Sequence, residues 1–271
     1  MDSQDTLKTC QSQRTARETV CARLGAAPYA PAIDPANFVA TVDNPFFPLP
    51  PGKTFVYEGE TAQGHEQDEF AVTHNTKVIL GVTCIEVHDT VHLAGDLTED
   101  TLDWFAQDKD GNVWYFGENS RQLAGGLFLG VEGSWIGGVD GAEPGIVMKA
   151  HPAIGDFYRQ EYLLGVAEDV AEVVSLTDTA TVPFPPGTFS NVPKTKETAP
   201  LEPDASENKY YATGVGNILT VDLVTGERSE LTQILDTPLV TRPICSDGSG
   251  ADRGRGAAAR QVAPHGERTQ R

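Results

Sequence analysis

The stretch TCIEVHDTVHL (Thr83–Leu93) decides the fold class of this 271-residue chain. Its odd-numbered positions are mostly apolar, whereas its even-numbered positions are mostly polar. A period of two over this length predicts a β-strand with one face in the core and the other toward solvent.

The segments that follow predict a β-hairpin. Two runs rich in aromatic residues, Leu102–Gln107 and Val113–Glu118, flank the segment DKDGN (Asp108–Asn112). The Asp110-Gly111 step is typical of a hairpin turn, because such a turn needs positive φ.

Short strands separated by turn residues continue on both sides of this hairpin. They are predicted at Thr54–Glu58, Glu69–His74, Lys77–Val82, Asp156–Leu164, Ala171–Thr181, Asn191–Thr198, Lys209–Gly214, Asn217–Val224 and Glu227–Leu235. Asn75 is predicted as a turn between two of these strands, and the glycine-rich stretch Gly125–Gly155 is predicted as loop. Few segments have a period of 3.6, so we expect a mainly β fold. The expected architecture is a curved antiparallel sheet of half-barrel or barrel type, with a sandwich as the alternative.

The composition is strongly acidic, with 39 Asp and Glu against 20 Lys and Arg and a formal net charge of −19. Residues 1–30 hold four bases and three acids, and residues 251–271 hold five arginines and two acids, which leaves −23 for the segment between them. This balance argues against nucleic acid as a partner and against an anionic membrane surface. It favours a bound cation, because like charges repel unless they are screened or paired.

The chain is predicted to have three parts. Residues 1–30 form a weakly ordered segment with a weak helix, residues 31–245 form a single antiparallel β domain, and residues 246–271 form a disordered, arginine-rich tail. The first 25 residues are polar and contain no export signal, and no stretch of about 18 apolar residues predicts a transmembrane segment.

Four cysteines leave the redox compartment open. They are Cys10, Cys21, Cys84 and Cys245, and none forms a CxxC pair of the zinc-ribbon or thioredoxin type. Disulfides in an exported protein and free thiols in a cytosolic one both agree with this spacing.

Six motifs in the body carry a resemblance. They are IDPANF (Ile33–Phe38), NPFFPLPPGKTFVYEG (Asn44–Gly59), EDTLDWFAQDKDGNVWYFGE (Glu99–Glu118), GVDGAEPGIVM (Gly138–Met148), GDFYRQEY (Gly155–Tyr162) and KYYATGVG (Lys209–Gly216). On these motifs, roughly residues 31–235 resemble a family of uncharacterised bacterial proteins that are often exported or lipoprotein-like. The resemblance implies an extracellular or periplasmic location and no particular catalytic residue. The last motif is also similar to envelope proteins of the LolA-like half-barrel type, which wrap a curved sheet around an apolar ligand or a helix.

Two groups of residues are candidate metal ligands. Glu86, His88 and His92 share the polar face of one predicted strand, and two imidazoles with one carboxylate are a common ligand set for zinc or iron. The second group is an acidic run comprising Asp96, Glu99, Asp100, Asp103, Asp108, Asp110, Asn112 and Glu118. Its part Asp108-x-Asp110-x-Asn112 resembles the opening of a calcium loop, although a hairpin turn explains the same residues without an ion.

Aromatic and amide side chains are candidate ligand-binding residues. Alternation places Tyr158, Gln160 and Tyr162 on one face of a strand, where they would offer hydroxyl and amide groups to a ligand inside a barrel. Trp104 and Trp114 of the predicted hairpin are added to this set. One alternative for this strand is a pair of packed tyrosines with Arg159 and Glu161 paired on the sheet surface. Another is that Arg159 and Glu161 face the interior as a buried ion pair.

The sequence lacks the motifs of several common enzyme and nucleotide-binding classes. The sequence contains no G-x-S-x-G, no G-x-x-x-x-G-K-[ST], no H-E-x-x-H and no dinucleotide-binding fingerprint.

Two functions therefore remain as hypotheses. The first is a non-catalytic β domain of the envelope or secreted fraction that binds an apolar small molecule or a protein segment, with a cation (Ca²⁺ or Zn²⁺) as an added possibility. The second is a metal-assisted hydrolase or lyase that uses Glu86, His88 and His92, or Asp103, Asp108 and Asp110.

Overall fold

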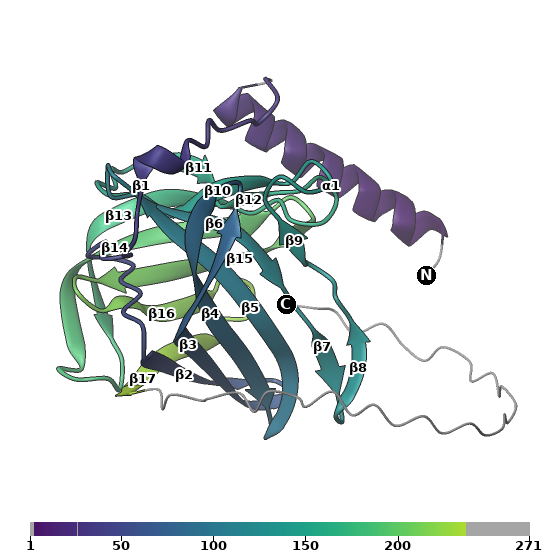
Figure 1. Ribbon diagram of the computed structural model, residues 1–271. Coiled ribbons are helices and arrows are strands. Elements are labelled where there is room, and N and C mark those ends of the chain that lie inside the picture. Colours follow the sequence, from purple (N-terminus) through teal and green to yellow (C-terminus); the bar gives the residue numbers. More distant parts are fainter. Residues whose placement is uncertain (1–2, 26, 237–271) are drawn as a thin grey trace, which may run out of the picture. The chain divides into compact units, whose positions relative to one another are not determined.

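The computed structural model describes residues 3–25 and 27–236 (Figure 1). Its elements are α1 (Ser3–Leu24), a 3-10 turn (Pro35–Asn37), β1 (Phe38–Val39), β2 (Lys53–Thr61), β3 (Gly64–Ile79), β4 (Val82–Leu93), β5 (Asp96–Asp108), β6 (Val113–Asn119), β7 (Gln122–Ala124), β8 (Leu127–Gly130), β9 (Trp135–Ile136), β10 (Glu143–Met148), β11 (Phe157–Arg159), β12 (Glu161–Tyr162), β13 (Val170–Thr181), β14 (Thr188–Ala199), β15 (Glu202–Ala212), β16 (Gly216–Asp222) and β17 (Arg228–Asp236). The predicted tail (residues 246–271) and the end of the predicted β domain (residues 237–245) lie outside the described residues.

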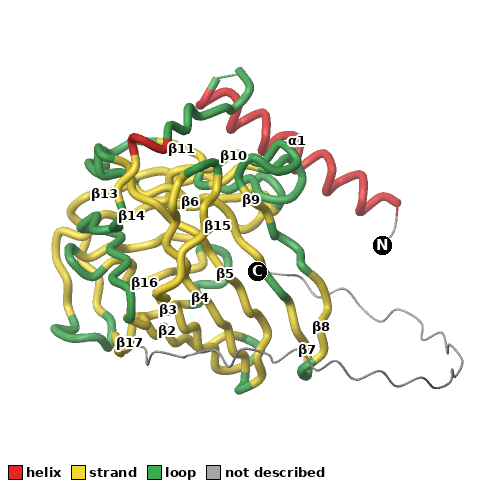
Figure 2. The backbone as a smooth tube through the Cα atoms, viewed as in Figure 1, coloured by secondary structure: helices red, strands yellow, loops and turns green. Residues whose placement is uncertain are grey.

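The strands form an antiparallel sheet that curls into a nearly closed barrel (Figures 1 and 2). β2 to β6 pair in chain order, and so do β13 to β17. β17 pairs with β2 and joins the two runs. On the other side β6 pairs with β10, β10 with β12, and β11 with β13, so the ring continues through the kinked segment β11–β12. The predicted fold class, a mainly β protein with a curved, barrel-like antiparallel sheet, is confirmed.

Two-residue turns join the long strands β3, β4 and β5. Leu80-Gly81 connects β3 to β4, and Ala94-Gly95 connects β4 to β5. All four residues have positive φ, between 50° and 89°. Turns of this kind match the right-handed twist of the strands that they connect.

The turn predicted at Asn75 is wrong. β3 runs from Gly64 to Ile79 without a break, and Asn75 lies where the β3–β4 register shifts, between Val72 and Thr76. A bulge admits extra residues while the strand continues, so a polar Asn inside a strand does not have to mark a turn.

The glycine-rich stretch predicted as loop contains three short strands, β8, β9 and β10. β9 approaches β6 so closely that a Cβ on Gly117 would lie 2.5 Å from the carbonyl oxygen of Trp135. Gly117 has φ +145°, and the absence of a side chain lets the two strands pair. The result is a buried Trp135 whose ring lies 5.3 Å from that of Tyr115, centroid to centroid.

One zone of the barrel interior is an apolar core. Phe55, Phe70, Phe105 and Tyr115 meet there, and the rings of Phe105 and Tyr115 stack with 4.8 Å between centroids. The connection from β1 to β2 adds apolar side chains from residues 42–49. This packing supplies the hydrophobic burial on which the barrel depends.

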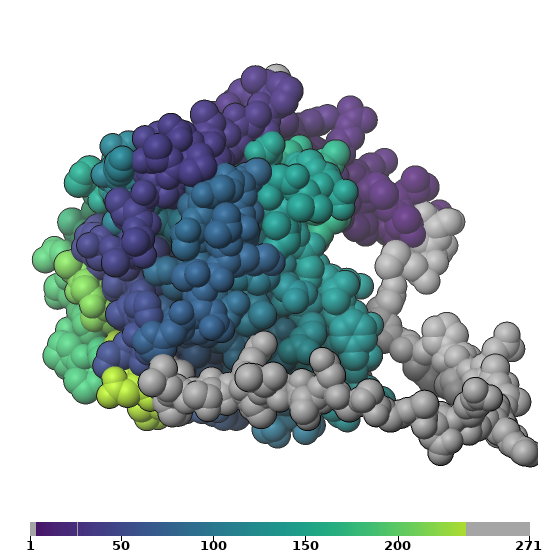
Figure 3. Space-filling model, in the orientation of Figure 1, coloured from purple at the N-terminus to yellow at the C-terminus, as the bar shows by residue number. Residues whose placement is uncertain are grey.

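A second apolar cluster lies on the outer face of β4 to β6. Trp104 and Phe116 are buried there beneath Ile33 and Phe38 of the segment that precedes β2. This segment, purple to dark blue, lies over the surface beside the blue strands (Figure 3). The ammonium of Lys77 stands 3.5 Å from the centre of the Trp104 ring. The sheet is therefore apolar on both faces in this region, which explains why Leu102–Gln107 is not simply alternating.

The N-terminal helix α1 is attached mainly through ion pairs. Arg17 contacts both carboxylate oxygens of Glu168, at 2.8 and 2.7 Å, and Arg23 contacts both of Glu172, at 2.6 and 2.9 Å. Val20 is the buried apolar residue of this helix. Among the described residues, no helix combines the length and apolar character needed to cross a membrane. Cys10, Cys21 and Cys84 are free thiols, and Cys245 lies outside the described residues.

Candidate functional site: an acidic belt inside the barrel

Cross-strand register places carboxyl groups inside the barrel. Asp68 of β3 lies opposite Tyr57, and Asp103 of β5 lies opposite Val87. Tyr57 and Val87 belong to the interior core, and directly opposed residues share a face of the sheet. Asp68 and Asp103 therefore face the interior as well.

The same reasoning applies along the neighbouring strands, where the interior changes from apolar to acidic, and Glu161 and Asp169 are added because of their contact with Trp135 and their proximity to Lys209 and Glu197, respectively. We call the interior-facing acids the acidic belt: Asp68, Asp89, Glu99, Asp103, Glu118, Glu161, Asp169, Glu197 and Glu207. Asp103 and Glu197 are buried, and the other members are half-buried although they face inward. Solvent therefore reaches this zone of the interior.

Asp68 and Asp89 form a carboxyl pair. Asp89 lies opposite Phe70, which is two residues along β3 from Asp68. The Oδ1 atoms of both carboxyls are buried and have no hydrogen-bond partner. Burial raises the pKa of Asp68 to about 6, and it also raises the pKa of Asp89 well above its usual range, where the charge of Asp68 adds to the effect. Two ionised carboxylates cannot hydrogen-bond each other. One proton on the pair allows them to do so, as in other carboxyl pairs that share a site.

Asp103, Tyr115 and Glu118 form a second cluster. The Tyr115 hydroxyl lies 2.5 Å from Oδ1 of Asp103 and 3.0 Å from Oε2 of Glu118. A phenol has one proton to donate, so the second contact is a hydrogen bond only if one of the carboxyls is protonated. Burial, followed by the nearby carboxylates, raises the pKa of both Asp103 and Glu118 well above the usual range.

Glu161 and Asp169 extend the belt toward β12 and β13. The Trp135 indole donates to Oε2 of Glu161 at 2.7 Å, yet burial and the charge of Asp169 hold the pKa of Glu161 well above its usual range. Burial raises the pKa of Asp169 to about 7, against the opposing charge of Lys209. Near pH 7 Asp169 is therefore partly protonated.

Glu197 is the belt carboxyl with a full set of partners. It accepts hydrogen bonds from Thr195 at 2.8 Å and from Tyr211 at 3.1 Å, and Lys209 lies 3.0 Å away. Burial alone would raise the pKa of Glu197, but the charge of Lys209 and these hydrogen bonds outweigh it and lower the pKa. Lys209 also contacts Glu207 at 3.0 Å.

Tyr158 faces the same interior zone without a partner. It lies opposite Ala171, which lies opposite Glu197, so the three share one face of the sheet. Its side chain is 7% exposed and its hydroxyl has no hydrogen-bond partner. Burial and then the charge of Glu197 raise the pKa of Tyr158. A buried hydroxyl without a partner is uncommon and calls for an explanation.

The predicted ligand-binding residues separate into two groups. Tyr158 and Gln160 are buried next to Glu197, to which Gln160 hydrogen-bonds. Tyr162 instead packs edge-on against Tyr29 with 5.8 Å between centroids, and the guanidinium of Arg159 stands 4.5 Å from the centre of the Tyr162 ring. The kink between β11 and β12 breaks the alternation here, because Glu161, expected on the opposite face from Gln160, also points inward.

The two predicted tryptophans do not join the belt. Trp104 is in the outer cluster, and Trp114 packs against that cluster while its indole donates to Asp108 at 2.8 Å.

The predicted metal ligands lie apart from each other. Glu86 is opposite the outward-facing Trp104 and accepts from Asn75 at 2.9 Å, whereas His88 is 2.9 Å from Asp100. His92 has a buried Nδ1 without a partner. Within residues 3–25 and 27–236, no three His, Cys, Asp or Glu side chains are close enough to hold a metal ion.

The calcium-like segment forms a turn. Asp108 accepts from both the backbone and the side-chain amide of Asn112 at 2.8 Å, and Asp110 is exposed. Asp103, the third acid of the alternative enzyme site, is held by Tyr115 inside the barrel, so it does not join Asp108 and Asp110.

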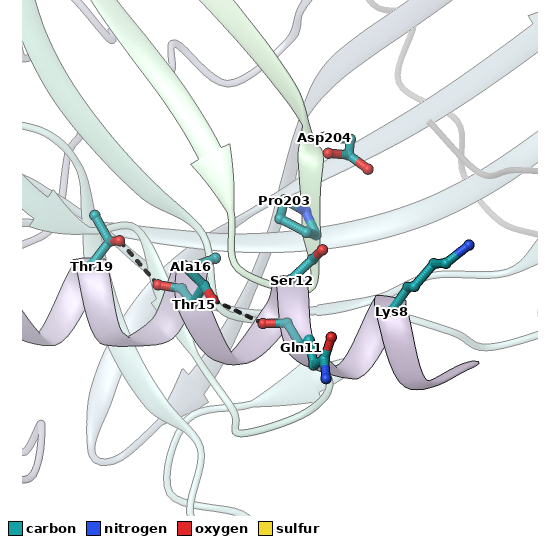
Figure 4. A pocket seen from close by; sticks show the side chains of 8 residues that line it. All are labelled: Lys8, Gln11, Ser12, Thr15, Ala16, Thr19, Pro203 and Asp204. Carbon is teal, nitrogen blue, oxygen red and sulfur yellow. Dashed lines mark hydrogen bonds between the residues drawn. The ribbon is translucent and has the colours of Figure 1, made fainter. Parts of the chain in front are cut away.

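A surface groove of about 610 Å³ lies between α1 and β15 (Figure 4). Its helix side presents hydroxyls that are already used, because Thr15 and Thr19 donate to the carbonyls of Gln11 and Thr15. The carboxyls whose pKa burial raises well above the usual range lie in the belt instead, so we take the belt as the candidate site.

Sequence reasoning missed most of the belt. The acidic run contains three belt members, Glu99, Asp103 and Glu118, although it was interpreted as a metal site. A further signal is Asp89, which falls on the apolar side of Thr83–Leu93, where an acid is out of place. The remaining members come together only through pairing between distant strands.

Comparison with known proteins adds little. No family model matches the chain, and no curated protein matches it significantly. Two solved structures are similar to it: a candidate exported protein with a YmcC-like fold from Bacteroides fragilis NCTC 9343, and a candidate lipoprotein from Parabacteroides distasonis ATCC 8503. Their identities are 16% and 13%, and each match has a TM-score of 0.40 and covers 70% of this chain and 98% of the other. At that TM-score we draw nothing from them, and the family and location suggested by the motifs stay predictions.

Proposed function

We propose that this protein is a non-catalytic binding protein that takes up a small molecule at the acidic belt. The observation that carries the proposal is a set of six interior carboxyls with raised pKa values. Five of them, Asp68, Asp89, Glu118, Glu161 and Asp169, are only half-buried, and Asp103 is buried among them.

These carboxyls are costly to the fold. An unpaired carboxyl that is moved out of water destabilises the folded state, and neutral residues of similar size would avoid that cost. Groups held in such an environment are typical of sites that bind or react. A belt that served only to fill the barrel would gain nothing from its acids.

The chemistry of the belt favours binding. Its contacts are the hydroxyls of Tyr115, Tyr211 and Thr195, the indole of Trp135 and the ammonium of Lys209, which orient a ligand by hydrogen bonds. The belt also favours a polar ligand over the apolar one expected from the half-barrel resemblance.

Native mass spectrometry tests this function. The full chain is incubated with a small-molecule cell extract and compared with the double variant Asp68→Asn/Asp103→Asn. We expect a stoichiometric adduct below about 1 kDa that is lost on denaturation and absent from the variant. The double variant Asp96→Asn/Asp110→Asn removes two exposed acids instead, and we expect it to keep the adduct.

Two results would count against the function. One is the absence of any adduct on the wild-type chain, and the other is an adduct that both double variants keep equally. A bound molecule recovered with a changed mass would point to an enzyme instead.

A further inference from the structure

The belt has far more acids than bases, and its arrangement indicates what would balance them. We propose that the molecule held at the acidic belt is a small organic cation with more than one ammonium or guanidinium group. This inference rests on the binding function proposed above and names its ligand class.

The first reason is the distribution of the carboxyls. The described residues bring no three acidic or imidazole side chains close enough for one metal ion. The carboxyls occur instead as separate groups, with Asp68 and Asp89 in one and Asp103 and Glu118 in another. A flexible organic molecule with several positive groups can reach more than one of these sites, whereas a single inorganic ion cannot.

The second reason is independent of the acids. The hydroxyl of Tyr158 is buried, lies on the same sheet face as Glu197 and has no partner. A hydroxyl oxygen accepts a hydrogen bond from an ammonium or guanidinium group. A bound cation would supply the missing partner of Tyr158.

The third reason is the aromatic component of the zone. Tyr115 contacts two belt acids, Tyr211 contacts Glu197, and Trp135 contacts Glu161. Aromatic side chains beside carboxylates bind organic cations well, because the methylene groups pack on the rings and the charge is attracted to the ring faces.

Binding of this kind releases protons. When an ammonium group approaches a protonated carboxyl, the O–H bond breaks, the carboxylate keeps the electron pair and the proton passes to the buffer. The ammonium then donates an N–H to the new carboxylate. The groups that would release these protons are Asp68, whose pKa burial raises to about 6, and Asp103, whose pKa burial raises well above its usual range.

Several other groups act on the Asp68–Asp89 pair from its own and neighbouring strands. They are Tyr57 of β2, Glu66 of β3, Glu99 and Asp103 of β5, and Lys209 of β15. The acids among them oppose ionisation of the pair and Lys209 favours it. A cation with more than one charge acts in the same direction as Lys209.

Isothermal titration calorimetry with spermidine tests the inference. The full chain is titrated at pH 7 in phosphate and in Tris, in about 0.15 M salt to screen exposed charges. We expect saturable binding whose heat differs between the buffers by an amount that corresponds to proton release. 1,8-Octanediol and calcium chloride are the matched neutral and inorganic probes, and neither should bind comparably.

Variants locate the binding. Asp68→Asn/Asp103→Asn should weaken spermidine binding at least ~10-fold, because it removes two charge-assisted contacts. Asn has nearly the shape of the protonated acid, so this variant should fold, and its thermal unfolding confirms that. Tyr158→Phe should weaken binding by a smaller factor. Asp96→Asn/Asp204→Asn, which changes two exposed acids, should leave binding unchanged.

The outcomes separate this inference from the binding function. The organic-cation inference is wrong if Asp68→Asn/Asp103→Asn does not weaken spermidine binding. It is also wrong if octanediol binds as tightly as spermidine. If the extract adduct is lost in the belt variant while spermidine fails to bind, the binding function stands and the cation assignment is wrong. If neither the adduct nor spermidine is bound, both are wrong.

Discussion

The hydroxyl of Tyr115 lies 2.5 Å from Oδ1 of Asp103, across two neighbouring strands of the barrel. The same hydroxyl is 3.0 Å from Glu118, so one phenol serves two carboxyls that burial holds at raised pKa. This contact links the apolar zone, where Tyr115 stacks on Phe105, to the acidic belt.

Tyr115→Phe should therefore destabilise the protein. The change keeps the ring but removes the hydroxyl that contacts the buried Asp103 and the half-buried Glu118, which costs roughly 1–3 kcal/mol in the free energy of unfolding. Urea denaturation at pH 7 measures the loss. Tyr210→Phe is the control. The Lys194 ammonium lies 5.5 Å from the centre of the Tyr210 ring, and this variant keeps the ring, so it should change stability by less than about 0.5 kcal/mol. Equal effects of the two variants would show that the Tyr115 hydroxyl contributes nothing to the free energy of unfolding.

The protein should become less stable as the pH rises from about 5 to 8. Burial raises the pKa of Asp68 to about 6 and that of Asp169 to about 7, so between these pH values the folded state binds more protons than the unfolded state. Stability from such groups is complete below their unfolded pKa and is lost as the pH passes through the folded pKa. Chemical denaturation at pH 5 and pH 8 checks the direction, and a flat or rising profile contradicts it.

Asp68→Asn should stabilise the empty protein at pH 8 and change it little at pH 5. Asn imitates the protonated acid, so it removes a cost that exists only when Asp68 ionises. The gain should be roughly 1–2 kcal/mol, below the full value of the shift because Asp68 is only half-buried. Asp110→Asn, at an exposed turn, is the control and should show no such pH dependence. A loss of stability at pH 8 would mean that Asp68 has a stabilising partner there.

Arg17→Ala should release the N-terminal helix. Arg17 holds Glu168, whose side chain is 2% exposed, and its removal leaves that carboxylate with the backbone N–H of Gly165 at 2.7 Å. Hydrogen exchange over residues 4–24 should rise clearly. Arg14→Ala breaks an exposed pair with Glu18 and should have an effect of about 0.5 kcal/mol or less. If the two variants exchange alike, the Arg17–Glu168 pair does not dock the helix.

The barrel could be predicted from sequence because its signals are local. Alternation in Thr83–Leu93 and the Asp110-Gly111 turn each depend on a few consecutive residues. The belt depends instead on the exact register between paired strands, and on the pairing of the run β2–β6 with the run β13–β17. Asp68 and Asp89 meet through the β3–β4 register, which contains a shift that the sequence does not announce.

The position of Glu161 shows a second reason. Strict alternation places it opposite to Tyr158, but the kink between β11 and β12 turns it toward Trp135. The side of the sheet on which Trp104 lies could not be predicted for a related reason, because a buried aromatic residue on a strand can face the core or an outer cluster. Which face is covered depends on the segment around Ile33 and Phe38, far away in sequence.

Trp104→Ala should separate stability from binding. The side chain is 3% exposed in the outer cluster beneath Lys77, so its removal should cost about 3–5 kcal/mol. Because Trp104 faces away from the belt, the fraction of molecules that stays folded should bind spermidine as the wild type does. Thermal unfolding measures the first effect, and calorimetry well below the transition measures the second. Weaker binding by the folded variant would restore Trp104 to the ligand-binding residues predicted from the sequence.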